Sequence, residues 1–409
     1  MGFVRFIMFL LRLIFGITYA MSGFLKLVDP VGTGLFVTEY LHTMHLGFLS
    51  WSATGLGLLM SVAELTVGLS MIMCIRMRFF SWVALVMSIG FTVLTGVVEL
   101  LGGLPDCGCF GNAISVDTYT SFIKNICLTV IVVPIFFFRK RFHLVAPEVA
   151  EWVFMGVHSL AALVFGIISW IYVPIIEFTD FQVGTDIDNL LEKSLDNNRF
   201  ENTYIYSKDG VEKEFTIDEI PDETWEYVGV KEGDNYESSH FDMTITTASG
   251  EYISKTITKS DEPYLLFAAF RPERLSERYW NKIRSAIPVI EAAGGHPLLL
   301  LPEGTSFDFG DTSHTAYSDY KTLITMVRSN GGLIFVDDGV VVKKRTGFVF
   351  TVEDLIKDIS DESEDMTVFE TIRHRLVYEV ILLFLLVVII LFRYICGIIY
   401  GKKGVRNEK

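Results

Sequence analysis

The chain has 409 residues, of which 51% are hydrophobic and 13% aromatic, and its formal net charge at pH 7 is -15. This composition is too apolar for an ordinary soluble domain and indicates an integral membrane protein, whose first partner is the lipid bilayer. Of the 49 Asp and Glu residues, 38 lie between Thr179 and Arg373. The acidic charge therefore belongs to one soluble domain, and its sign disfavours nucleic acid as a partner.

Apolar runs long enough to cross a bilayer predict about six transmembrane helices. They occupy residues 3–24, 53–75, 79–101, 119–138, 153–176 and 376–396. Arg12 interrupts the first run and five more runs follow it, so we expect an uncleaved helix and not a signal peptide. Polar residues between the first two runs predict a short helix that lies at the outer membrane interface.

Basic residues gather in alternate loops, which predicts the orientation of the chain. They follow the second, fourth and sixth runs and include Arg76, Arg78, Arg139, Lys140, Arg141, Lys402 and Lys403. By the positive-inside rule both termini are cytoplasmic, and the acidic domain lies outside. We therefore expect a multi-pass protein of a bacterial inner membrane with a periplasmic domain, in a compartment where disulfides form.

Two of the five cysteines, Cys107 and Cys109, stand one residue apart in a Gly-rich loop before the fourth run. A disulfide closed over Gly108 would be strained and readily reduced, so we predict a redox-active pair with catalytic roles for both thiols. A structural disulfide is the alternative. A metal site is disfavoured because two thiols without a His in the loop leave a zinc ion half liganded. The loop carries no Lys or Arg to stabilise a thiolate.

Ionisable residues within apolar runs are costly and usually have partners in the protein interior. Arg12, Glu64 and Glu99 are such residues, and with Lys26 they form a predicted intramembrane polar site. We expect Arg12 to pair with Glu64, which would neutralise both, and Lys26 to reach the interface. Such a site is either a pocket for a quinone headgroup or a proton path, or a clamp between helices.

The outer domain, residues 178–372, is predicted to be an α/β thioredoxin-like soluble domain with a β-rich N-terminal extension. Hairpins are expected around the Asp209-Gly210 turn after residues 203–206 and around 243–253. Strands are expected at 264–270, 298–301, 333–336 and 340–342, and helices from 275 to Gly294-Gly295, over 320–328 and over 351–358. Pro288 should kink the first of these helices or end it early. Residues 271–274 contain no thiol where thioredoxins carry C-x-x-C, so we expect the domain to bind and not to catalyse.

The membrane half resembles the DoxX-like family and, within it, the MauE-like proteins of methylamine utilisation. The residues that carry the resemblance are Arg12-Leu13 with Gly16, Ser22 to Leu27, Glu64 and Cys107 to Gly111. The resemblance implies a four-helix membrane domain at 1–145, a fifth transmembrane helix at 146–177, the thioredoxin-like domain at 178–372, and a sixth helix with a basic cytoplasmic tail at 373–409. MauE-like proteins are thought to act in disulfide-dependent maturation of an exported enzyme.

Three functional hypotheses follow. The first is a membrane-bound thiol–disulfide factor, either an oxidoreductase or an accessory in the maturation of exported proteins, that acts on an exported client protein through Cys107 and Cys109. The second is a non-enzymatic scaffold that binds its partner through a degenerate thioredoxin-like domain. The third is a quinone-linked oxidoreductase subunit, in which a quinone would be the cofactor; the sequence itself identifies no cofactor.

Overall fold

The chain divides into two compact units. The first comprises Met1–Thr179 and Phe369–Lys409, and the second comprises Asp180–Val368. The structure is a computed structural model. It describes residues 2–102, 104, 107–114, 116–142, 148–171, 174, 177–192, 203–208, 211–215, 225–231, 243–260, 262–347 and 350–360.

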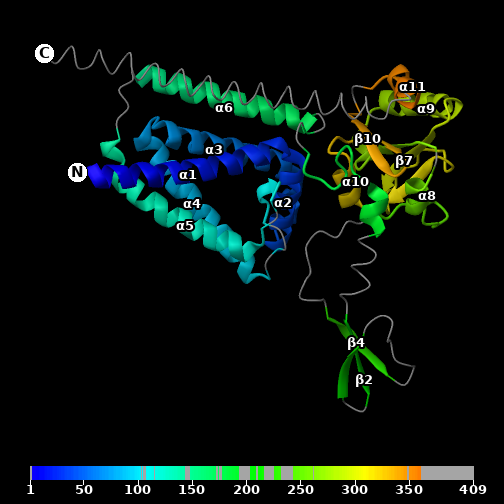
Figure 1. Ribbon diagram of the computed structural model, residues 1–409, viewed down its shortest axis with the longest axis horizontal. Coiled ribbons are helices and arrows are strands. Elements are labelled where there is room, and N and C mark those ends of the chain that lie inside the picture. Colours follow the sequence, from blue (N-terminus) through cyan, green and yellow to red (C-terminus); the bar gives the residue numbers. More distant parts are fainter. Residues whose placement is uncertain are drawn as a thin grey trace. The chain divides into compact units, whose positions relative to one another are not determined.

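The described part of the first unit is a bundle of helices (Figure 1). They are α1 (Gly2–Val28), α2 (Pro30–Thr43), α3 (Ala53–Met73), α4 (Met77–Leu100), α5 (Thr118–Phe138) and α6 (Glu148–Ile171), with 3-10 turns η1 (Gly47–Ser52) and η2 (Arg139–Arg141). Among the described residues, five helical segments are long and apolar enough to cross a membrane, which confirms five of the expected spans. The sixth, at 376–396, lies outside the described residues. α2 is the short helix expected between the first two spans.

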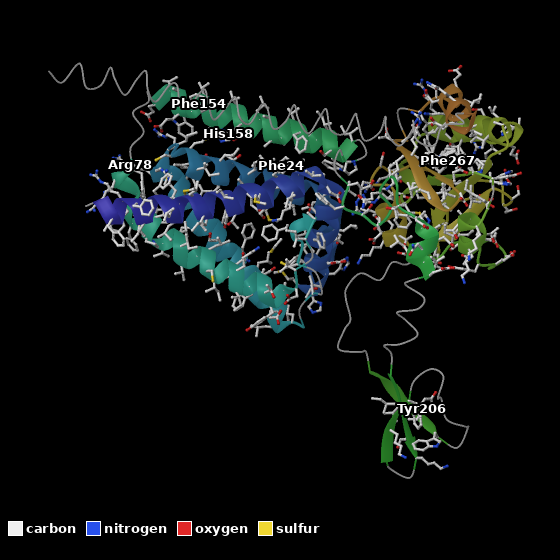
Figure 2. The ribbon with its side chains drawn as sticks, in the orientation of Figure 1. Phe24, Arg78, Phe154, His158, Tyr206 and Phe267 are labelled. Carbon is white, nitrogen blue, oxygen red and sulfur yellow. The ribbon has the colours of Figure 1, made fainter. Side chains whose placement is uncertain are left out.

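Small residues bring α1 and α3 into close contact. A side chain at Gly16 would meet Gly68 and Ile72, and one at Gly23 would meet Ser61 and Leu65. The two helices therefore pack with their backbones nearly touching. Farther out, Phe24 of α1 stacks on Phe165 of α6, with ring centroids 5.8 Å apart, and Figure 2 shows Phe24 inside the bundle.

The second unit contains a mixed six-stranded sheet in the order β10-β9-β6-β7-β8-β5. Its strands are β5 (Thr246–Thr247), β6 (Tyr264–Ala268), β7 (His296–Pro302), β8 (Thr315–Ser318), β9 (Gly332–Asp337) and β10 (Val340–Arg345). Strands β6, β7 and β8 are parallel, and β9 runs antiparallel to both β6 and β10. The helices are α8 (Ser254–Thr258), α9 (Glu277–Ala292), α10 (Tyr320–Met326) and α11 (Val352–Ser360), with the turn η4 (Pro272–Arg274).

The order of strands and helices after residue 264 follows the prediction, with two differences. The structure adds β8 in a segment expected to be a polar loop, where Ala316 is fully buried. Of the two outcomes expected at Pro288, a kink or an early end of α9, the early end is wrong, because the helix continues to Ala292. Pro288 removes one hydrogen bond, but Ile287 and Ile290 are buried on either side of it and hold the last turn in place.

The extension before this sheet contains the expected hairpin. Strands β2 (Thr203–Lys208), β3 (Val211–Phe215) and β4 (Glu226–Lys231) form an antiparallel sheet in the order β3-β2-β4. Phe215 packs edge-on against Tyr206 and Trp225, with centroids 5.9 and 5.2 Å away. Figure 2 shows Tyr206 on this small sheet.

Candidate functional site

The loop between α4 and α5 holds the cysteine pair in a defined conformation. The Cys107 N–H donates to Val116 O at 2.8 Å, and the Gly111 N–H donates to Gly108 O at 3.0 Å. Gly108 has φ +62°, and a side chain there would collide with Phe36 of α2. Only glycine combines this backbone conformation with so close a neighbour, so the residue between the cysteines serves the turn and the packing together.

The two thiols face each other. Cys107 Sγ and Cys109 Sγ are 2.9 Å apart, and Cys107 is 4% exposed. The Tyr40 hydroxyl from α2 is 2.7 Å from Cys107 Sγ. Because an S–S bond is about 2.0 Å long, a small movement of either side chain would close the disulfide.

A buried ion pair lies directly beneath the loop. Lys26 Nζ is 2.7 Å from Glu64 Oε1, and the two side chains are 7% and 2% exposed. Ser22, one helical turn before Lys26 on the same face of α1, places its hydroxyl 2.6 Å from Glu64 Oε2 and 2.7 Å from the Cys109 carbonyl oxygen. The hydroxyl thus links the ion pair to the backbone of the cysteine loop.

The electrostatic surroundings separate the two thiols chemically. The hydrogen bond between them lowers the pKa of Cys109. The positive charges of Lys124 and Lys26 also lower it, whereas burial raises it. The result is a pKa of about 4. The same hydrogen bond, together with burial, raises the pKa of Cys107 well above its ordinary value. At neutral pH the reduced pair therefore holds one thiolate, at Cys109, and one thiol, at Cys107.

A cavity of about 540 Å³ opens beside the pair. Residues of α1, α2, α3, α4, α5 and the cysteine loop line it, and most of its wall is apolar. Cys107, Cys109, Lys26 and Glu64 all contribute to the lining. The volume falls in the range of about 300–1,000 Å³ that is usual for small-molecule sites.

The polar residues expected to act together do so only in part. Lys26 and Glu64 belong to the site, but the expected Arg12–Glu64 pair is wrong, since the partner of Glu64 is Lys26. Arg12 stands 14 residues before Lys26 on α1, about 21 Å along the helix, and its guanidinium lies over the rings of Phe9 and Phe142. Glu99 is half-buried at the last turn of α4 and does not line the cavity.

Lys26 was expected to extend to the membrane interface, and this expectation is also wrong. The residue is buried because α1 continues to Val28, four residues beyond the expected end of the span. The longer helix places Lys26 opposite Glu64 of α3, where the carboxylate compensates the charge that burial removes from water.

Sequence reasoning missed two residues of the site, Lys124 and Tyr40. Lys124 lies on α5, outside the cysteine loop, and its Nζ is 4.7 Å from the centroid of the Phe110 ring. The positive charge absent from the loop is thus supplied by helices α1 and α5. A lysine two turns inside an apolar span was the available signal for Lys124, while nothing in the sequence singled out Tyr40.

Known protein families match two parts of the chain. Residues 4–138 match the family model described as methylamine utilisation protein MauE. This part of the membrane unit is MauE-like. Residues 200–232 match a domain of unknown function, DUF8463. No curated protein and no solved structure matches the chain.

The MauE-like match includes helices α1 to α5 and therefore every residue described in the candidate site. It ends before α6 and before the second unit. The match and the apolar helices together suggest a MauE-like multi-pass membrane protein with an accessory role in protein maturation.

Proposed function

We propose that this protein is a membrane-bound thiol–disulfide factor in which Cys107 and Cys109 exchange a disulfide with an exported client protein. The observation that carries the proposal is the contact of the two sulfur atoms at 2.9 Å, with lysines from two helices near Cys109. A structural disulfide requires no such charge. A stabilised thiolate is the nucleophile and the leaving group of exchange chemistry.

The exchange takes place in two steps that balance. A thiolate of the client attacks Cys109 Sγ of the oxidised pair, because Cys109 is the more exposed of the two residues. The S–S bond breaks, a mixed disulfide forms, and Cys107 leaves and takes up a proton. The second client thiol, after losing its proton to solvent, then attacks the client sulfur and expels Cys109 as a thiolate, which its low pKa makes a good leaving group. The client dithiol is oxidised and the pair is reduced.

We also propose that the second unit is a periplasmic, thioredoxin-like binding domain that holds the client. The order β6-α9-β7, then α10, β9, β10 and α11, with β8 added between β7 and α10, supports this assignment. At the end of β6, where thioredoxins carry their thiols, Asn330 bonds to both backbone groups of Arg271, at 2.9 Å each. The Arg271 guanidinium in turn donates to the Tyr320 hydroxyl at 2.9 Å. This corner supplies a fixed polar surface without a redox group.

The test uses the full-length protein in lipid nanodiscs with the pair oxidised in advance, and a synthetic peptide with two thiols as the client. We expect the wild type to oxidise the peptide, and Cys107→Ser and Cys109→Ser to lose this activity equally, with no further loss in the double variant. Given the same peptide in its disulfide form, Cys107→Ser should form a mixed disulfide through Cys109, because the Cys109 thiolate attacks the peptide disulfide and Cys107 is absent to resolve the adduct. Product and adduct are measured by alkylation and mass spectrometry.

The matched control is Cys127→Ser, which removes an exposed thiol of α5 outside the cavity lining and should leave the exchange unchanged. Wild-type peptide oxidation by the Cys107→Ser, Cys109→Ser double variant would overturn the proposal. It would leave the scaffold hypothesis in its place.

A further inference from the structure

Repeated turnover of the cysteine pair requires an electron acceptor, because each client disulfide leaves two electrons on Cys107 and Cys109. The cavity beside the pair is where such an acceptor would meet the sulfur atoms, since both cysteines form part of its wall. The chemistry of the remaining wall then identifies the class of acceptor.

The wall selects an apolar molecule that arrives through the membrane. Leu56 and Leu59 of α3 contribute to the lining and are also 45% and 61% exposed. Both belong to a helix that is long and apolar enough to span the bilayer, so we expect the cavity to open toward lipid. A phosphate-bearing dinucleotide would have to bring its charges through that surface, whereas an apolar ring with a hydrocarbon tail would not.

Several polar groups also line the cavity. Tyr40 lies against Cys107 and Lys124 acts on Cys109. Asn125 and the Lys26–Glu64 pair complete the set. An apolar wall with a few convergent polar groups is the usual form of a site that orients a small ligand. Hydroxyl, amide and ammonium groups are donors for carbonyl oxygens on a ring.

We propose that the cavity binds a membrane quinone, which accepts two electrons from Cys107 and Cys109 and so regenerates the disulfide. This inference rests on the proposed thiol–disulfide function. In the step, an S–S bond forms between the two Sγ atoms and the S–H bond of Cys107 breaks. The electron pair passes to the quinone, whose two oxygens take up the proton from Cys107 and one proton from solvent. A thiolate, a thiol, a quinone and a proton become a disulfide and a quinol.

The experiment uses the full-length protein in lipid nanodiscs with the pair reduced, and decylubiquinone as the probe. Loss of the quinone is followed by its ultraviolet absorbance, and oxidation of the pair by alkylation and mass spectrometry. We expect one quinol for each disulfide formed. The Cys107→Ser, Cys109→Ser double variant should bind the quinone without reducing it.

Two neighbouring substitutions on α4 locate the binding site. Leu94 lines the cavity, whereas Val93 is 58% exposed and does not. Leu94→Trp should fill part of the cavity and weaken the apparent affinity for decylubiquinone by about tenfold or more. Val93→Trp adds the same side chain toward lipid and should leave the affinity unchanged.

A control without quinone separates this inference from the proposed function. In it, protein whose cysteine pair is oxidised in advance is mixed with the dithiol peptide, and oxidation of the peptide is measured. If the peptide is oxidised but decylubiquinone does not reoxidise the pair, the quinone inference is wrong and the exchange function stands. If the two tryptophan variants weaken quinone binding equally, or if a long-chain alcohol competes as well as the quinone, the cavity is a lipid site and the inference is overturned.

Discussion

At the scale of single residues, the site depends on charges that approach the cysteine pair from other helices. Lys124 comes from α5 and Lys26 from α1, and both act on Cys109. Lys26 is already paired with Glu64 at 2.7 Å. We therefore expect the charge of Lys124 to be more available to the Cys109 thiolate than the charge of Lys26. Removing one partner of a buried ion pair typically costs about 3–5 kcal/mol, so Lys124 is also the safer position to change.

Replacement of Lys124 by Met should raise the pKa of Cys109, because a cation favours the charged form of a thiol. In the wild type the pKa is about 4, so the alkylation rate of Cys109 should be nearly constant from about pH 6 to 8. In Lys124→Met the midpoint of the alkylation profile should rise by about one pH unit or more. Site-resolved mass spectrometry of iodoacetamide-treated protein measures it.

The control for this prediction is Lys124→Arg, which keeps the charge and should keep the wild-type profile. An unchanged profile in Lys124→Met would show that the hydrogen bond from Cys107 stabilises the thiolate without the lysine.

At the scale of elements, the packing of α1 on α3 positions the site. Gly23 lies between Ser22 and the segment that carries Lys26, and its Cα faces the backbone of α3 at Ser61 and Leu65. This close approach sets the register in which Glu64 meets Lys26. The loop between α4 and α5, which carries the cysteine pair, is then held to α1 by the hydrogen bond that the Ser22 hydroxyl donates to Cys109 O.

Gly23→Ala should separate α1 from α3, because the added Cβ would lie 2.7 Å from Ser61 O and closer still to Leu65 N. Overpacking of this kind costs about 1–3 kcal/mol. We expect a lower thermal unfolding midpoint in detergent and slower peptide oxidation, measured on the same preparation.

Gly90→Ala on α4 is the matched control, since a Cβ there meets nothing within 4 Å. It should unfold at or above the wild-type temperature, because alanine favours a helix over glycine. Equal destabilisation by both changes would contradict the role assigned to the α1–α3 contact.

At the scale of the whole molecule, the proposed chemistry requires the cysteine loop and the acidic unit to face the same compartment as the client. The alternation of basic and acidic segments predicts the periplasm for both. Up to residue 171 the described residues contain five helices that are long and apolar enough to span a membrane, and the predicted orientation depends on their alternation.

Cysteines introduced singly at Ser207 and at Lys402 test the orientation. In intact cells an impermeant maleimide should label the first and not the second, because both termini are predicted to be cytoplasmic. Labelling after membrane permeabilisation should reach both and serves as the control. The reverse pattern in intact cells would contradict the orientation and the exchange function together.

The sequence by itself determined the features that depend on neighbouring residues. Apolar runs located the five described spans, and the one-residue spacing of Cys107 and Cys109 predicted that their sulfur atoms could meet, as they do at 2.9 Å, because helix length and ring size are local properties. Period-2 and helical patterns likewise located most elements of the second unit, but the short strand β8 was missed. These elements are held by their own backbone hydrogen bonds and by one buried face.

Only the tertiary structure decided which charges meet. Glu64 is 38 residues from Lys26, and Lys124 reaches Cys109 from a different helix, so no spacing in the sequence distinguishes these partners from Arg12. The choice follows from how closely glycines let α1 approach α3, which fixes the register of one helix on the other. The cavity has the same origin, because it is the space that five helices and one loop enclose together and no single segment encodes it.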